Sequence, residues 1–173
     1  MDWYETVFEV IDMRSFSNLW FWIALAVLWS SASHYVLGVP YDMVTRARRY
    51  GADAAEDVDA LTMISVRRIL YITRVAGLWL AAFVAFVLSS LAVMGFWYGV
   101  EFAQAVLLLA APMTIVGALS IRTARQIERL GVRGPDLWRS LLLHRMVVQA
   151  IGMVAIFVTA MWGMWQNLNA AIL

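Results

Sequence analysis

The sequence predicts an all-α, polytopic membrane protein with four transmembrane helices in a single domain. Three features support this: an apolar composition, four long apolar runs, and arginines gathered between the runs. Of the 173 residues, 63% are hydrophobic and 14% are charged, whereas a soluble domain carries roughly 45–50% apolar and about 25% charged residues. Crossing a ~30 Å hydrocarbon core takes about 20 apolar residues, so the chain has room for four spans and short loops.

The apolar runs define the predicted spans, at about 18–39, 75–97, 102–121 and 146–165. Two longer connections remain, 40–74 and 122–145. Upstream of the first span, acidic residues recur every three or four positions between residues 2 and 14, opposite an apolar face. This pattern is typical of an amphipathic helix that lies on the membrane surface.

The arginines orient the predicted spans. All 13 basic residues are arginine; twelve lie in the two connections, and Arg14 alone lies on the other side. Six of the nine tryptophans cluster near the opposite ends of the spans. By the positive-inside rule, we expect both connections in the cytoplasm and both termini on the periplasmic side of a bacterial inner membrane.

The second and third spans are predicted to continue as helices beyond the membrane. Asp53-Ala-Ala-Glu56 resembles a capping box, and one helix is expected from about Ala54 to Tyr98. The third span is expected to continue past Ile121 until Gly131 caps it. Because a tight turn at 95–99 makes the two spans antiparallel, we expect their extensions to lie side by side, with 53–59 projecting past the third helix.

Two stripes of small residues repeat every fourth position in the spans. We call them the small-residue faces of the second and fourth spans. They comprise Gly77, Ala81, Ala85 and Ser89, and Ala155, Thr159 and Gly163, respectively. Such patterns allow another helix to approach closely but do not identify that helix.

The charged cytoplasmic segments are the predicted docking surface for a protein partner. The candidate residues are Arg46, Arg48, Arg49, Asp53, Glu56, Asp57, Asp59, Arg122, Arg125 and Arg129. Arginines alone could serve only to bind anionic headgroups and set topology. Lipids would repel the four acids, so that end of the helix is expected to face water or a basic partner.

The sequence offers little for catalysis. It has no cysteine and no lysine, which excludes disulfides, thiolate chemistry, cysteine-bound metal and lysine Schiff bases. Nucleotide-binding, serine-hydrolase and zinc-protease motifs are absent, and no span has the central carboxylate that a coupled transporter usually needs. The polar side chains within the spans, Gln104, Gln149, Thr114 and Thr159, are instead expected to hydrogen-bond between helices. We therefore expect a protein that is not an enzyme, with no metal, cofactor or nucleic acid partner.

Haem binding is the one cofactor hypothesis that the residues allow. Two histidines on facing helices can ligate haem in a four-helix bundle, and His34 and His144 both belong to the cytoplasmic half. Their predicted depths differ, because His34 lies inside the span and His144 lies beside Arg145 at its boundary. The alternative is that His34 is a polar packing group and His144 an interfacial side chain.

Two stretches, IDMRSFSNLWFWI and SHYVLGVPYDMVTRARR, resemble a small alphaproteobacterial family of four-helix membrane proteins. Its members are often labelled a component of the SufBCD iron–sulfur cluster assembly complex. The resemblance implies a membrane anchor or accessory partner of that complex and brings no catalytic motif. The sequence thus favours an accessory or scaffold protein; a small subunit of a transporter or redox complex is the alternative, and a homo-oligomer is open.

Overall fold

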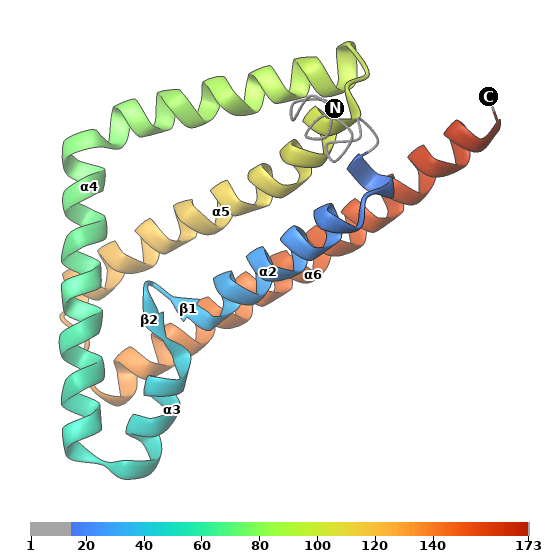
Figure 1. Cartoon of the computed structure of the whole chain (residues 1–173). Coiled ribbons are helices and arrows are strands. Elements are labelled where there is room, and N and C mark those ends of the chain that lie inside the picture. The colour runs from blue at the N-terminus through green and yellow to red at the C-terminus, as the bar shows by residue number, and fades with distance from the viewer. Residues whose placement is uncertain (1–14, 173) are drawn as a thin grey trace, which may run out of the picture.

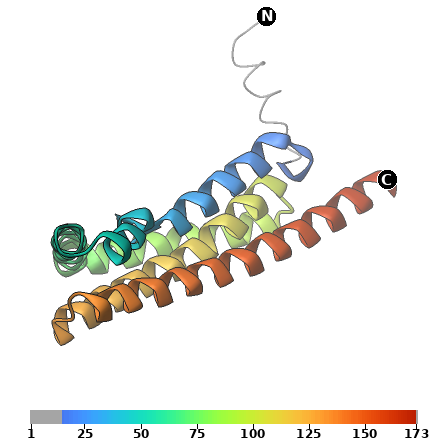
Figure 2. The same cartoon turned by 90° about the horizontal axis from the view of Figure 1, so that it is seen from below.

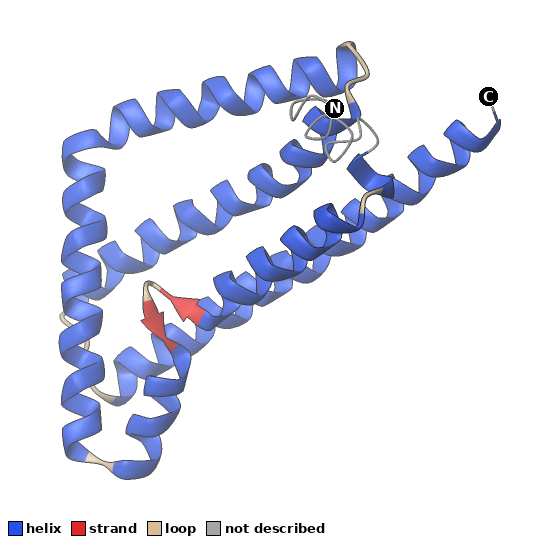
Figure 3. Ribbon diagram, viewed as in Figure 1, coloured by secondary structure: helices blue, strands red, loops and turns tan. Residues whose placement is uncertain are grey.

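The computed structural model describes residues 15–172, and the predicted interfacial helix at 2–14 lies outside them. The described part is almost entirely helical (Figure 3). Its elements are η1 (Ser15–Ser17), α2 (Leu19–His34), β1 (Tyr35–Val36), β2 (Val39–Pro40), α3 (Tyr41–Tyr50), α4 (Ala52–Ala92), the π-helical turn η2 (Val93–Trp97), α5 (Glu101–Leu130) and α6 (Pro135–Ile172). Within these residues, α4 with η2, α5 and α6 are long and apolar enough to cross a membrane.

The first predicted span is shorter than expected. Helix α2 has 16 residues, about 24 Å at 1.5 Å per residue, and it ends at His34 instead of Val39. The chain then turns back in a two-residue β-hairpin, in which Val36 pairs with Val39. Leu37 and Gly38 take φ values of 53° and 79°, as a hairpin turn with two left-handed central residues requires. This turn, hidden inside an apolar run, ends the helix.

Helix α4 is continuous, as predicted, but it is not straight. Figure 1 shows a sharp corner near its middle. The first arm, which carries Val58 and Val66, runs across the direction of α2, α5 and α6, and Figure 2 shows it end-on. The second arm carries the small-residue face of the second span, called from here on the α4 small-residue face. The small-residue face of the fourth span lies on α6 and is called the α6 small-residue face. Near the middle of α4, Thr73 donates a hydrogen bond to the carbonyl of Ile69 (2.8 Å), a side-chain contact that often bends helices.

The larger hydrophobic core lies where the first arm of α4 crosses the other helices. We call this part of the molecule the arginine-rich end. Its buried residues come from the hairpin, α3, α4, α5 and α6: Val36, Leu37, Tyr41, Val44, Ala47, Val58, Val66, Leu70, Ala124, Ile127, Leu137 and Leu141. Four segments thus pack around one transverse helix, which makes this end the most extensively buried part of the described chain.

A smaller core joins α2, α5 and α6 along their length. Leu25 and Trp29 from α2 pack with Val116 of α5 and with Val148 and Ala155 of α6. No residue of α4 that follows Leu70 belongs to either core. The apolar helices therefore differ strongly in how much of their surface the chain itself covers.

Candidate functional site

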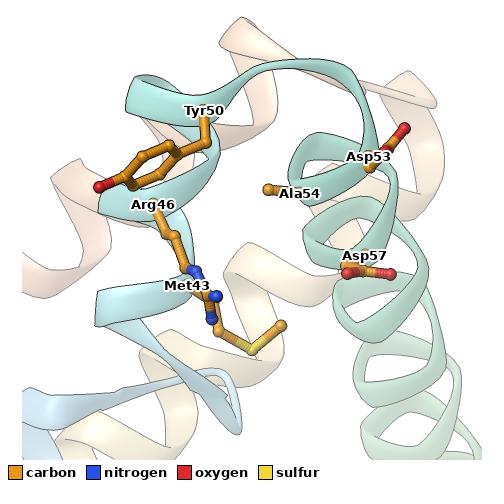
Figure 4. A pocket seen from close by; sticks show the side chains of 6 residues that line it. All are labelled: Met43, Arg46, Tyr50, Asp53, Ala54 and Asp57. Carbon is orange, nitrogen blue, oxygen red and sulfur yellow. The ribbon is translucent and has the colours of Figure 1, made fainter.

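The start of α4 and the helix before it form a charged pocket of about 520 Å³. Met43, Arg46 and Tyr50 come from α3, and Asp53, Ala54 and Asp57 come from α4 (Figure 4). Gly51 makes the sharp connection between the two helices with a φ of 86°, which favours glycine. Two carboxylates and one guanidinium line the pocket, so its surface is suited to a basic group.

The four predicted acids do not form one surface. Asp53 and Asp57 line the pocket with α3, whereas Glu56 and Asp59 line another, of about 490 Å³, with Arg67 and Arg133. Asp59 is half-buried.

Asp59 also makes a hydrogen bond that links two helices. Its carboxylate accepts a hydrogen bond from the backbone N–H of Gly134 (Oδ2, 2.9 Å), directly before α6 begins at Pro135. Asp59 therefore joins α4 to the start of α6, where a carboxylate also stabilises the helix dipole.

The predicted arginines divide in the same way. Arg48 and Arg49 on α3 and Arg122 on α5 are exposed. Arg125 and Arg129 line a hollow of about 220 Å³ where α5 meets α4, together with Arg74. The extensions of the second and third spans were predicted to lie side by side, and this is wrong: the first arm of α4 crosses the end of α5 (Figure 1), because α4 turns near its middle.

The two small-residue faces have different surroundings. On the α6 face, Ala155 and Thr159 are buried, and a Cβ on Gly163 would lie 3.2 Å from the ring of Phe16. On the α4 face, by contrast, Ala81, Ala85 and Ser89 are exposed. A Cβ on Gly77 would touch only Thr73 of its own helix. The described chain therefore leaves most of the α4 face uncovered.

The histidines exchange the environments that the sequence predicted. His34, expected inside the span, is exposed and stacks edge-on against Tyr35. His144 is 7% exposed. Its Nε2 lies 3.2 Å from the hydroxyl of Ser120, and its Nδ1 lies 3.1 Å from the hydroxyl of Thr123. Both ring nitrogens of His144 are thus paired with α5, and one would have to be released before it could bind haem iron.

Polar side chains join the helices at the opposite end of the molecule. Gln104 donates to the carbonyl of Gly95 (2.7 Å) and accepts from the indole of Trp162 (3.0 Å) and the amide of Gln166. Glu101 accepts from the backbone N–H of Phe16 (2.8 Å). Gln104 was predicted to bond between helices, and it does.

The other polar side chains predicted to bond between helices behave differently. Thr114 and Thr159 instead bond to carbonyls of their own helices, and Gln149 is exposed. An interhelical role was therefore wrong for these two threonine hydroxyls. A threonine hydroxyl in a helix readily donates a hydrogen bond to a backbone carbonyl of the preceding turn, and it then needs no partner on a neighbouring helix.

One arginine that lines the hollow between α4 and α5 was not among the docking residues predicted from the sequence. From the sequence, Arg74 was counted only among the arginines of the connection 40–74, but it lies with Arg125 and Arg129. A signal existed: Arg74 precedes Gly99 by 25 residues (99 − 74), and Arg125 follows it by 26 (125 − 99). Two antiparallel helices joined at Gly99 bring such positions to the same level.

Comparison of the chain with protein-family models, with curated proteins and with solved structures found no match. Within residues 15–172, no group of three or more histidine, aspartate or glutamate side chains is arranged to hold a metal ion. What the described residues do present is charged hollows and uncovered apolar faces, which are features of binding surfaces.

Proposed function

We propose that this protein is an accessory or scaffold protein of the bacterial inner membrane that docks a cytoplasmic partner at its arginine-rich end. It is not an enzyme. In this proposal α2 crosses the membrane beside α6, giving four spans with both termini in the periplasm. The concentration of arginine at one end supports the orientation. The iron–sulfur cluster assembly complex to which the sequence resemblance points is the first partner to test.

The observation that carries the proposal is the pocket between α3 and α4. It adjoins the larger core, since Met43 and Ala54 of its lining pack against the cluster of buried residues to which Val44, Ala47 and Val58 belong. A surface held by such a core loses little conformational entropy when a partner binds. Its two carboxylates and Tyr50, 77% exposed, are suited to a partner that presents a basic side chain.

The test uses the full-length protein, tagged in its native host and purified in a mild detergent. The double variant Asp53→Asn/Asp57→Asn should lower recovery of the SufBCD proteins about tenfold or more, which corresponds to about 1.4 kcal/mol. Asp42→Asn/Asp136→Asn removes the same charge from the same end outside the pocket, and should retain the partner. Asp59 is left unchanged because its loss would disturb α6. Equal recovery from both double variants would show that the pocket is not the docking site.

The second candidate function is a small membrane subunit of a transporter or redox complex. It is favoured by the second arm of α4, since no residue of the most apolar stretch of α4 is buried against the described chain. In that case Gly77→Leu/Ala81→Leu should dissociate the complex while Asp53→Asn/Asp57→Asn leaves it intact. The opposite result supports the docking proposal.

A further inference from the structure

The hollow between α4 and α5 is rich in arginine. Arg74 from α4 and Arg125 and Arg129 from α5 line it, together with Leu70, Thr73 and Glu128. One carboxylate faces three guanidinium groups, so the hollow has a net formal charge of +2 (three arginines minus one glutamate). Guanidinium groups bind phosphate oxygens in bidentate fashion, and a phosphate group suits this charge.

The arginines of the hollow remain available to a ligand. Arg74 Nη2 lies 3.9 Å from Glu128 Oε1, and the two side chains are 74% and 47% exposed. Such a long, solvated ion pair contributes little and is readily rearranged. The backbone around it is fixed, because Leu70 and Ile127 are buried in the larger core. The hollow therefore combines a fixed backbone with arginine side chains that are accessible to a ligand.

The surroundings of the hollow distinguish a lipid from a free phosphate. Directly after Arg74, α4 presents apolar side chains: Val75, Leu78 and Trp79 are 66%, 83% and 78% exposed. Positive charge thus borders a long apolar surface that the chain leaves uncovered. Only a ligand with an anionic head and apolar tails uses both. The pocket between α3 and α4, with two carboxylates and one arginine, lacks this charge and adjoins the buried core.

We propose that the hollow formed by Arg74, Arg125 and Arg129 is a binding site for an anionic phospholipid. The phosphate lies among the three arginines, and the acyl chains lie along the second arm of α4. The site rests on the membrane location proposed above and needs no protein partner. The lipid thereby covers apolar surface that the fold exposes and holds the corner of α4 at the headgroup level.

Native mass spectrometry of the delipidated, full-length protein in detergent tests the site. Titration with phosphatidylglycerol should give a tighter adduct than phosphatidylcholine with the same acyl chains. Arg125→Gln/Arg129→Gln should weaken phosphatidylglycerol binding about 30-fold, the equivalent of about 1 kcal/mol for each arginine. The matched control Arg48→Gln/Arg49→Gln removes two exposed arginines of α3 and should change the affinity less than about twofold, because these lie outside the hollow.

Two further measurements keep the proposal falsifiable. Glu128→Gln removes the opposing carboxylate and should tighten binding, a result that loss of structure could not produce. Glycerol phosphate at an equal phosphate concentration should not displace the lipid, since it lacks acyl chains. The proposal is overturned if both arginine double variants bind equally, if phosphatidylcholine binds as tightly, or if glycerol phosphate competes fully. None of these outcomes bears on the docking of a protein partner by the pocket between α3 and α4.

Discussion

The two small-residue faces have the same sequence pattern but different surroundings. On α6 the small residues lie beneath Phe16 and Trp29, and Ala155 and Thr159 are buried. On α4, Ala81, Ala85 and Ser89 are exposed, and a Cβ on Gly77 would touch only its own helix. The four-residue repeat therefore permits close packing in both helices, but it is used within the chain only where an aromatic side chain occupies the groove.

The difference follows from how each helix is held. Helix α6 is fixed at one end by Leu137 and Leu141 in the larger core and along its length by α2. Helix α4 is fixed by its first arm, and the corner then directs its second arm away from both cores (Figure 1). The second arm is consequently left exposed by the described chain, and it is the surface on which the proposed phospholipid and the alternative membrane partner would lie.

The largest expected effect comes from filling the groove on α6. A Cβ at Gly152, one turn before Ala155, would lie 2.8 Å from Cε3 of Trp29. Gly152→Leu should therefore lower the free energy of unfolding by about 3 kcal/mol through overpacking, measured by SDS titration in mixed micelles. Gly117→Leu is the matched control, because a Cβ there meets nothing within 4 Å. Equal stability of the two variants would contradict the close contact of α2 with α6.

A somewhat smaller effect is expected at the polar contacts that hold the far half of α6. Gln104→Leu removes the partners of the Gly95 carbonyl and of the Trp162 and Gln166 side chains. Leaving buried polar groups unpaired should cost about 2 kcal/mol, measured by the same titration. Gln149→Leu, at an exposed position of α6, should be neutral. A neutral Gln104→Leu would mean that the α6 small-residue face alone holds the helix.

A third variant tests the contact between the first arm of α4 and α6. Asp59→Ala removes the carboxylate that accepts from the backbone N–H of Gly134, and should cost about 1 kcal/mol, as loss of a helix cap does. Asp57→Ala, exposed two residues earlier, should leave the unfolding midpoint unchanged. If both variants lose stability equally, general charge on α4 matters more than this hydrogen bond.

The smallest effect on stability is expected on the second arm of α4. Gly77→Leu/Ala81→Leu should change the unfolding free energy of the isolated protein by less than about 0.5 kcal/mol, because Ala81 is exposed and a Cβ on Gly77 meets only Thr73 of the same helix. Chemical cross-linking in membranes then shows whether any larger assembly is lost. A marked destabilisation of the isolated protein would show that this face packs within the chain after all.

Part of the candidate site followed from the sequence. Residue type and spacing identified the acidic start of α4, the arginines on α3 and α5 and the hydrogen bonding of Gln104. Charged side chains near helix ends stay at the surface, and an amide within an apolar helix needs a hydrogen-bond partner. The division of the acids did not follow: nothing local distinguishes Asp59, which bonds to Gly134, from Asp57, which lines a pocket. Likewise, the exchange of environments between His34 and His144 depends on which helices become neighbours.

Composition and periodicity alone determined that the chain is helical and that at least three helices are long and apolar enough to cross a membrane, because these properties depend on local hydrogen bonding and side-chain polarity. Only the tertiary structure decided that an apolar run closes in a hairpin at Leu37 and Gly38 and that α4 turns near its middle. In both places the two local conformations, a turn or bend and a continued helix, have similar free energies. The observed conformations allow Val58, Val66 and Leu70 to pack against the ends of α5 and α6, and this packing selects them.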